Sequence, residues 1–393
     1  MDKRRALLLS GERIDALYLL SRWATAMEDW IHFPEPTPAV EPHPTVENAL
    51  AVRNWLWVVA GLVFVMVLVG GATRLTESGL SITEWKPITG IIPPLSHKDW
   101  LYAFEDYKKI PQYQELFPNM DLAGFQVIYA WEWAHRLLGR VIGLVFVIPF
   151  MWFWVKRRLP PGLKPKLFGI LALGALQGVA GWWMVASGLV SRVEVAQERL
   201  AIHLLLAALI FSACMWVAGG LGPKADSAIL HGARRLRFVA ALTLALVFAQ
   251  LGVGALVAGL RAGSIDNTWP LMEGAFSPPA SVLWKLSPWW ANLLDNPVSV
   301  QFAHRSIAYV IFALAFAHML DAAMNAAGKA RRGAVLVFGH VALQVALGVA
   351  TLVLVQDEWS GTPHILFALA HQAVGFGVLA VATLQTRRLV AAG

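Results

Sequence analysis

The sequence predicts an all-α polytopic membrane protein in which eight transmembrane helices form two four-helix bundles related by a pseudo-two-fold axis. Three observations predict this fold. Of the 393 residues, 57% are hydrophobic and only 15% are charged, whereas soluble proteins carry about 25% charged residues. Eight apolar stretches are long enough to cross a bilayer as helices, which takes about 20 residues each. The pentapeptide Glu132–Arg136 recurs in closely similar form at Gln301–Arg305, and internal repeats constrain the architecture.

The eight apolar stretches are expected to be helices because none of them alternates apolar and polar residues as barrel strands do. The second stretch is the longest, so its helix is expected to tilt or to project beyond the bilayer. We place the spans at residues 55–73, 124–154, 167–189, 200–220, 236–260, 299–321, 334–355 and 364–386.

The net charge of +7 and the pI of about 9.6 do not indicate a nucleic-acid-binding protein, because the basic residues gather at the termini and in alternate loops. Basic loops of polytopic membrane proteins face the cytoplasm. We therefore expect both termini in the cytoplasm, as an even number of spans also requires, and no nucleic-acid partner. The basic clusters lie at residues 3–53, 156–166, 224–237, 329–332 and 387–388.

The chain divides into an N-terminal extension, two bundles and a linker. The extension is charged and proline-rich, lacks the features of a secretory signal peptide, and is expected to be poorly ordered. In the outer loop of the first bundle, Asp99–Tyr107 predicts an amphipathic helix at the membrane surface. The expected bounds are 1–54 for the cytoplasmic extension, 55–220 for the N-terminal bundle with its outer loop at 75–122, 221–235 for the cytoplasmic linker and 236–390 for the C-terminal bundle.

The chain has a single cysteine, Cys214, which lies within the fourth span. One cysteine excludes a disulfide bond within the chain and a cysteine-rich metal site. We expect its side chain to act as a small buried apolar group.

Histidines extend the internal repeat beyond the pentapeptides. His135 and His203 are 68 residues apart, and His304 and His371 are 67 residues apart. Each half of the chain has four spans, so the halves have the same orientation in the membrane. We therefore expect them to be related by an axis along the membrane normal.

The four repeated histidines are candidate axial ligands of haem. In each bundle the second and fourth spans bring one imidazole each to a similar depth, and facing histidines in a helix bundle can bind haem iron from both sides. Polar residues inside membrane spans are costly and often functional. The alternative for a single histidine is packing in the bundle core. His318 and His340 have no counterparts in the first half, but they form an alternative pair near the inner face, because His318 follows His304 by 14 residues.

Two arginines and two glutamines also lie in the repeats. Arg136 and Arg305 directly follow their histidines, where a guanidinium group could bind a haem propionate or extend to the lipid headgroups. Gln177 and Gln344 could bond between helices or line the haem sites.

Glu132 and Gln301 mark a difference between the halves. Glu132 lies three residues before His135, on the same helical face. A carboxyl group in an apolar bundle is a candidate for proton transfer or electrostatic stabilisation, whereas the neutral Gln301 is not. We therefore expect a reactive site in the first half and an electron-transfer haem in the second. The alternative is that Glu132 lies at the rim of the bundle in water.

The chain resembles the haem A synthase family, in particular the branch shared by mitochondria and alphaproteobacteria. The resemblance covers roughly residues 53–390 and is carried by the motifs Gly70–Pro87, Glu132–Arg140 and Gly181–Gly188. It implies an enzyme that oxidises the C8 methyl group of haem O to a formyl group through an alcohol. The product, haem A, serves terminal oxidases. Another bacterial branch has cysteine pairs in its outer loops, and this chain has none there.

The resemblance also implies roles for individual residues. His304 and His371 would ligate a permanent haem b in the second bundle. His135 and His203 would hold haem O in the first bundle, with Glu132 beside the reacting methyl group.

Two other functions remain open from the sequence. A di-haem b-type cytochrome that takes electrons from quinol would use the four histidines, but it would not need the difference between Glu132 and Gln301. A transporter or assembly factor with two similar halves would need no haem.

The expected location is a bacterial inner membrane. A mitochondrial inner membrane is less favoured because Asp2, Glu12 and Asp15 are unusual in a transit peptide. The expected partners are haem O, membrane lipid and an unidentified electron donor. Haem O synthase and a second copy of the chain are further candidates.

Overall fold

The computed structural model describes residues 44–222, 227–354 and 362–392. Most of the expected N-terminal extension, and so its predicted lack of order, lies outside the described residues. The helix that contains the first span begins at Pro44, so residues 44–54 of that expected extension are helical.

Eight helices in the described part of the chain are long and apolar enough to cross a membrane. Each overlaps one of the predicted spans, so the prediction of an all-α protein with eight spans is confirmed. The helices are α2 (Pro44–Leu75), α4 (Leu122–Val155), α5 (Lys164–Ala186), α6 (Gln197–Ala218), α7 (Ala233–Gly259), α9 (Pro297–Asn325), α10 (Gly328–Leu354) and α11 (Thr362–Ala391).

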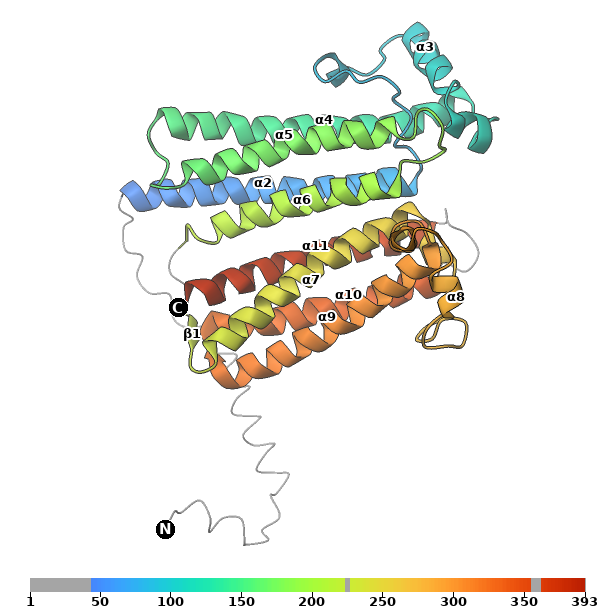
Figure 1. Cartoon of the computed structure of the whole chain (residues 1–393). Helices are drawn as coiled ribbons and strands as arrows, with labels where there is room; N and C mark the ends of the chain where they lie inside the picture. The colour runs from blue at the N-terminus through green and yellow to red at the C-terminus, as the bar shows by residue number, and fades with distance from the viewer. Residues whose placement is uncertain (1–43, 223–226, 355–361, 393) are drawn as a thin grey trace, which may run out of the picture. The chain divides into compact units, whose positions relative to one another are not determined.

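The helices lie in two groups, with α2, α4, α5 and α6 in one and α7, α9, α10 and α11 in the other (Figure 1). Helices α6, α7 and α11 pack against one another between the groups. One contact there joins Phe211 of α6 and Phe376 of α11, whose ring centroids are 5.5 Å apart. The α6 span is 44% buried, whereas the α5 and α10 spans are 11% buried. Apolar faces of α5 and α10 are thus left for lipid.

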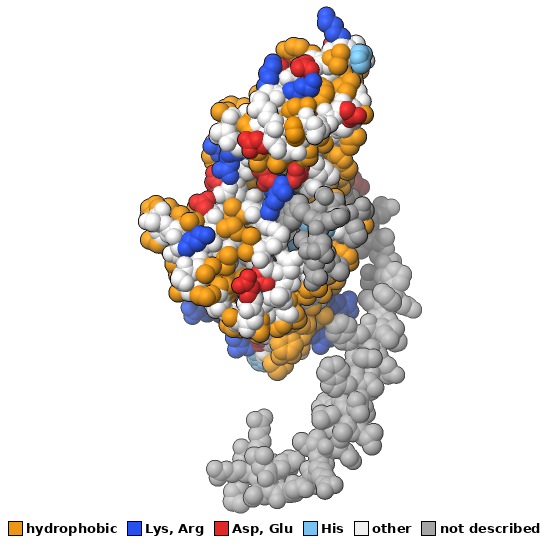
Figure 2. Space-filling view, turned by 90° about the vertical axis from the view of Figure 1, so that its right-hand side faces the viewer, with side chains coloured by type: hydrophobic (Ala, Val, Ile, Leu, Met, Phe, Trp, Pro, Cys, Tyr) orange, Lys and Arg blue, Asp and Glu red, His pale blue; other side chains and the backbone are white. Residues whose placement is uncertain are grey.

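The longer loops lie at one end of the helices, where Figure 1 places α3 (His97–Tyr107) and α8 (Ala280–Leu283). This end carries charged groups of both signs among hydrophobic side chains (Figure 2). The opposite end holds the antiparallel pair of β1 (Ser227–Ile229) and β2 (Ala326–Ala327). The remaining short elements, all in the outer loops, are η1 (Thr89–Ile91), η2 (Gln112–Leu116), η3 (Ala262–Ser264) and η4 (Trp289–Leu293).

Helix α3 confirms the helix predicted in the first outer loop. It begins two residues earlier than expected because Ser96 and Asp99 form a reciprocal cap at its N-terminus. The helix buries Phe104 and Tyr107 against Phe125 of α4. Burial raises the pKa of the Tyr107 phenol, which keeps its proton and donates a hydrogen bond of 3.0 Å to the side-chain oxygen of Gln112. The outer loop is therefore packed onto the bundle.

A polar cluster joins the two groups of helices at the outer-loop end. Arg261 forms ion pairs with Glu77 and Glu194, and Arg74 donates a hydrogen bond of 2.5 Å to Glu194. Arg74 also bonds to the carbonyl oxygen of Ala258 at 3.2 Å. Glu77 and Arg261 have φ angles of 55° and 49°, in the left-handed region that non-glycine residues rarely adopt. The chain therefore turns in the same way after α2 and after α7.

Candidate functional site

The four repeated histidines each face a glycine on the preceding membrane helix. A Cβ atom added to these glycines would lie within 3.2 Å of Cε1 of the facing imidazole, and real Cβ contacts are rarely so short. Glycine is thus needed to bring each helix pair this close. The pairs are Gly70 and His135 at 2.8 Å, Gly181 and His203 at 2.9 Å, Gly254 and His304 at 3.2 Å, and Gly348 and His371 at 2.8 Å.

Three of the histidines also have a glutamine amide beside Nε2. The separations between glutamine Nε2 and histidine Nε2 are 3.3 Å for Gln177 and His203, 3.3 Å for Gln250 and His304, and 3.2 Å for Gln344 and His371. Each glutamine precedes by four residues the glycine that faces the same histidine.

Gln250 was not among the residues predicted from the sequence to lie at these sites. Its signal was available, because the spacing of Gln177 to Gly181 and of Gln344 to Gly348 recurs at Gln250 and Gly254.

The two histidines of the second half lie at a separation that suits one shared metal ion. The ring centroids of His304 and His371 are 6.5 Å apart, with the planes at 67°. Metal–imidazole bonds are about 2 Å long, so imidazoles that bind one ion from opposite sides have centroids about 6 Å apart.

The residues present fit a haem at each histidine pair. The Nδ1 atoms of the four histidines and the side-chain oxygens of the three glutamines are buried without a hydrogen-bond partner in the described part of the chain. Buried polar atoms without a hydrogen-bond partner cost free energy in a helix bundle, and a bound haem would change the contacts of these side chains. No cluster of three or more His, Cys, Asp and Glu in the described residues could hold a metal ion alone. A metal here needs further donors, which a porphyrin supplies.

Glu132 is buried, with 3% of its surface exposed. Its Oε2 accepts hydrogen bonds from the Ser81 hydroxyl at 2.7 Å and from the Ile82 backbone N–H at 2.8 Å. Its Oε1 accepts two from Arg136, at 2.6 and 3.1 Å. The alternative of a rim glutamate in water is therefore wrong. The carboxyl group is held in one orientation by donors from the outer loop and from its own helix.

Gln301 is equally buried, at 3% exposed, but its contact with the loop is reversed. Its Nε2 donates a hydrogen bond of 2.8 Å to the carbonyl oxygen of Asp266. Asp266 follows Ile82 by 184 residues, the separation that also relates Gly70 to Gly254. At matched loop positions, Glu132 accepts from a backbone N–H whereas Gln301 donates to a backbone carbonyl.

Arg136 and Arg305 bind the outer loops in register. Arg136 donates to the carbonyl oxygens of Ile82 at 2.8 Å and Glu84 at 3.1 Å. Arg305 donates to those of Asp266 and Thr268, both at 2.8 Å.

These contacts differ from both roles considered for the arginines, which were binding to propionates and extension to headgroups. They hold each outer loop against the helix that carries the neighbouring histidine. Binding of haem propionates by Arg136 and Arg305 stays a prediction.

The alternative pair of His318 and His340 is not brought together by any recorded contact. His318 is 2% exposed and lies 3.3 Å from the amide of Gln385. His340 Nδ1 donates to the carbonyl oxygen of Leu336 in its own helix at 2.9 Å. These contacts suit packing and leave the four repeated histidines as the candidates.

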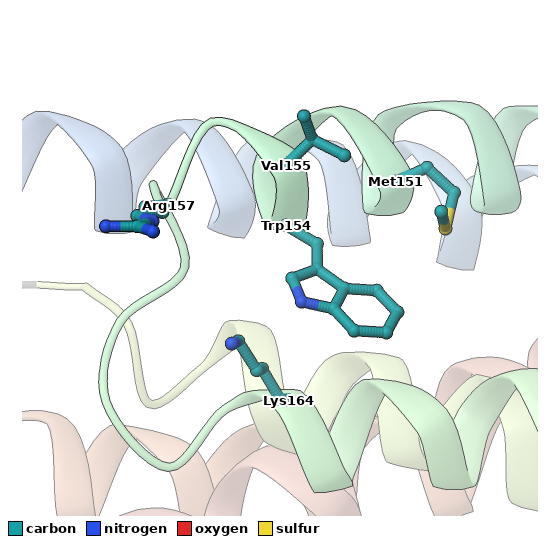
Figure 3. A pocket seen from close by; sticks show the side chains of 5 residues that line it. All are labelled: Met151, Trp154, Val155, Arg157 and Lys164. Carbon is teal, nitrogen blue, oxygen red and sulfur yellow. The ribbon is translucent and has the colours of Figure 1, made fainter.

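A pocket lies at the opposite end of the first group of helices, where α4 ends and α5 begins. Met151, Trp154, Val155, Arg157 and Lys164 line it (Figure 3). It lies far along α4 from His135 and contains no histidine, so we do not assign the chemistry to it.

Comparison with known proteins identifies the family. Residues 53–383 match the family model for COX15-CtaA, described as cytochrome oxidase assembly protein. A protein of Rhodopseudomonas palustris (strain HaA2) is 54% identical over 341 residues, covering 87% of this chain and 91% of its own length. A protein of Beijerinckia indica is 53% identical over 320 residues, covering 81% and 89%.

A third relative, from Bradyrhizobium diazoefficiens, is 53% identical over 339 residues, covering 86% of this chain and 91% of its own length. All three relatives are named heme A synthase. The resemblance read from the sequence motifs is thereby confirmed. The chain belongs to the COX15-CtaA family of cytochrome oxidase assembly proteins.

Proposed function

We propose that this protein is a haem A synthase, a membrane oxidoreductase that converts the C8 methyl group of haem O to a formyl group by two successive oxygen-dependent hydroxylations. Each hydroxylation would consume one O₂ and two electrons from the electron donor, and the gem-diol so formed would lose water to give the formyl group. The haem A so formed would be used by terminal oxidases. The names of the relatives support this reaction. The observation that carries the proposal is a difference between the two otherwise matched histidine sites. One helical turn before the first histidine of each pair, the first half has the buried carboxyl group of Glu132 and the second half has the neutral amide of Gln301.

The second half is the electron-transfer site in this proposal. His304 and His371 would ligate haem b, and their centroid separation of 6.5 Å supports this pairing. A bound haem b supplies one-electron transfer. Gly254 and Gly348 let the neighbouring helices approach the imidazoles and so fix the direction of both rings. Gln301 places a neutral amide where the first half has a carboxyl group.

The first half is the reacting site. His135 and His203 would hold the substrate, haem O, with Glu132 one helical turn before His135. The donors of Ser81, Ile82 and Arg136 hold the Glu132 carboxyl group before the substrate binds, so little reorganisation is needed during reaction. A fixed carboxylate can stabilise positive charge that develops on the substrate or accept a proton from its new hydroxyl group.

The arginines keep water away from both sites in this scheme. Arg136 and Arg305 pull the outer loops over the ends of α4 and α9 through backbone carbonyls. The guanidinium groups also lie next to the histidines, where they would bind the anionic edge of each haem.

The architecture that suits this function is a pair of bundles, residues 55–220 and 236–390, related by a two-fold axis along the membrane normal. The linker at 221–235 and both termini would face the cytoplasm of a bacterium, because the basic residues gather at that end. Contacts between residues 184 positions apart, at Arg74 with Ala258 and at Glu77 with Arg261, support the axis. An electron donor and haem O synthase would be partners.

Pigment analysis tests the function. The full chain is expressed with a haem O synthase in cells that make no haem A, and the haems are extracted from the purified protein and from the membranes. Haem A or its hydroxylated precursor is expected, and both should be absent from cells that lack the chain. Recovery of haem B with unconverted haem O would instead support a di-haem electron carrier. Protein without any Soret absorbance would support a transporter or an assembly factor that binds no haem.

A further inference from the structure

Gln372 of α11 connects the second histidine pair to the first group of helices. It directly follows His371 in the chain, and its Nε2 donates a hydrogen bond of 2.8 Å to the carbonyl oxygen of Val67 in α2. Its side-chain oxygen lies so close to Gly71 that a Cβ atom added to this glycine would overlap it. A side chain next to one candidate haem ligand is thus bonded to a helix of the other half.

The turn of α2 that Gln372 contacts is also the turn that faces His135. Val67 and Gly71 are four residues apart and so bound one turn of the helix, with Gly70 inside it. A Cβ atom added to Gly70 would lie 2.8 Å from His135 Cε1. The two adjacent glycines therefore have different contacts, because Gly70 faces the histidine of its own half and Gly71 faces the glutamine of the other half.

The equivalent contact between α6 and α7 is apolar. Leu204 of α6 precedes Gln372 by 168 residues, the separation that also relates His203 to His371. Ala255 of α7 follows Gly71 by 184 residues. Leu204 packs against the buried cluster that contains Ala255, and neither side chain can form a hydrogen bond. Glycine and glutamine thus occur together where the polar contact is made, and alanine and leucine occur together at the equivalent place.

The contact of Gln372 makes the turn behind His135 depend on the position of α11. A haem ligated by His371 would fix the orientation of that imidazole and of the backbone next to it, which also carries Gln372. Coupling between two sites requires elements whose arrangement both sites can affect. Here a single side chain and one helical turn connect the two histidines.

We propose that Gln372 is a positioning residue that couples the two histidine pairs, so that occupancy of the second pair by haem b strengthens substrate binding at the first. Coupling between binding sites is reciprocal, so occupancy of the first pair would also strengthen binding of haem b. Substrate would then bind preferentially to protein that already holds its electron-transfer haem. The inference rests on the proposed function, because it assigns substrate to the first pair and haem b to the second.

A binding cycle tests the coupling without turnover. The probe for the first pair is gallium protoporphyrin, a redox-inert haem analogue, and its binding to the purified full-length protein is followed by difference absorbance. Its affinity is compared between protein that holds haem b and the His304→Ala/His371→Ala protein, which lacks both ligands of the second pair. Without further substitutions, the analogue is expected to bind at least roughly 5-fold more tightly when haem b is present, the lower end of typical coupling between sites.

The decisive variant gives this contact the residues of the equivalent place. Gln372→Leu combined with Gly71→Ala copies Leu204 and Ala255, which already pack together in the same protein. This double variant should still bind haem b and the analogue, but the ratio of the two affinities should fall to about one. Gln372→Met removes the donor without changing Gly71 and should give the same result.

Gln385→Leu on the same helix is the matched control. The amide of Gln385 donates a hydrogen bond of 2.9 Å to the carbonyl oxygen of Ala330, within the second half, so the affinity ratio should stay at its wild-type value. The inference is overturned by a wild-type ratio of one, by an unchanged ratio in the Gln372 variants, or by an equal loss in Gln385→Leu.

The outcomes also separate the inference from the proposed function. If haem A is produced but Gln372→Met leaves the affinity ratio unchanged, the inference fails and the enzyme assignment stands. If the ratio falls in Gln372→Met but no haem A is produced, the coupling stands and the assignment of the reaction fails.

Discussion

Glu77 forms an ion pair with Arg261, which lies 184 residues later in the chain. The same separation joins Arg74 and the carbonyl oxygen of Ala258. It also relates Ile82 and Glu84, whose carbonyl oxygens accept from Arg136, to Asp266 and Thr268, whose carbonyl oxygens accept from Arg305. Contact between equivalent residues is the contact expected where a two-fold axis passes between two repeats. In this case the equivalent residues have opposite charge, so the pair is attractive.

The ion pair between the halves should contribute to stability. Glu77→Gln is expected to lower the free energy of unfolding by about 1 kcal/mol, because the pair is partly screened by water and Arg261 keeps Glu194 as a partner. Thermal unfolding in detergent measures the change. Glu105→Gln removes an exposed ion pair with Lys108 and should have almost no effect. If both variants lower the free energy of unfolding equally, the ion pair between the halves contributes no more to stability than an exposed ion pair.

Glu132→Gln should retain haem binding and lose conversion of haem O by on the order of 100-fold or more. In the wild type, one carboxyl oxygen accepts from Ser81 and Ile82 and the other accepts from Arg136. The glutamine amide has only one oxygen, so its NH₂ group would face the donors on the other side. Haem extraction measures the haem content, and a single-turnover assay measures the conversion of haem O. Glu132→Asp keeps the charge and should recover part of the activity. Wild-type conversion by Glu132→Gln would remove this residue from the mechanism.

Alanine substitutions of the histidines should separate the two haems. His304→Ala and His371→Ala are expected to remove haem b, because each leaves the iron with one axial imidazole. His135→Ala and His203→Ala should keep haem b and lose bound haem O. The Soret spectrum and extracted haem reveal which haem remains. If haem b disappears instead with His135→Ala and His203→Ala, the two halves have been assigned in reverse.

The glycines that face the histidines should be irreplaceable. In Gly348→Ala the new methyl group would lie 2.8 Å from His371 Cε1, and overpacking costs about 1–3 kcal/mol, so haem b affinity should fall roughly 5- to 150-fold. Gly339→Ala on the same helix is the control, because a Cβ there meets nothing within 4 Å. Haem titration of the purified protein compares the two.

The corresponding test of the first half uses Gly181→Ala, where the methyl group would lie 2.9 Å from His203, with Gly178→Ala as the control in open space. Retention of full affinity by both Gly348→Ala and Gly181→Ala would mean that the imidazoles move freely and are not positioned by these helices.

Much of the fold could be predicted because membrane helices are recorded in the sequence as long apolar stretches. All eight spans were found this way, and the helix at α3 followed from its amphipathic pattern. The repeat then selected the four histidines that face glycines. These features depend on residues close together in sequence or on direct comparison of the halves.

The contacts of Glu132 could not be predicted in the same way. Its partners Ser81 and Ile82 lie about 50 residues earlier, in a loop whose path depends on Arg136 and on the packing of α3. Local periodicity carries no information on which peptide group of a loop meets a side chain. For the same reason the hydrogen bonds from the two arginines to loop carbonyl oxygens were not predicted.

The loop contacts of Glu132 and Gln301 tie each side chain to its own half of the protein. At position 132 a backbone N–H faces the side chain, which therefore has to accept a hydrogen bond. At position 301 the carbonyl oxygen of Asp266 faces the side chain, which therefore has to donate one. An exchange of Glu132 and Gln301 without further changes would leave a mismatched hydrogen bond in each half.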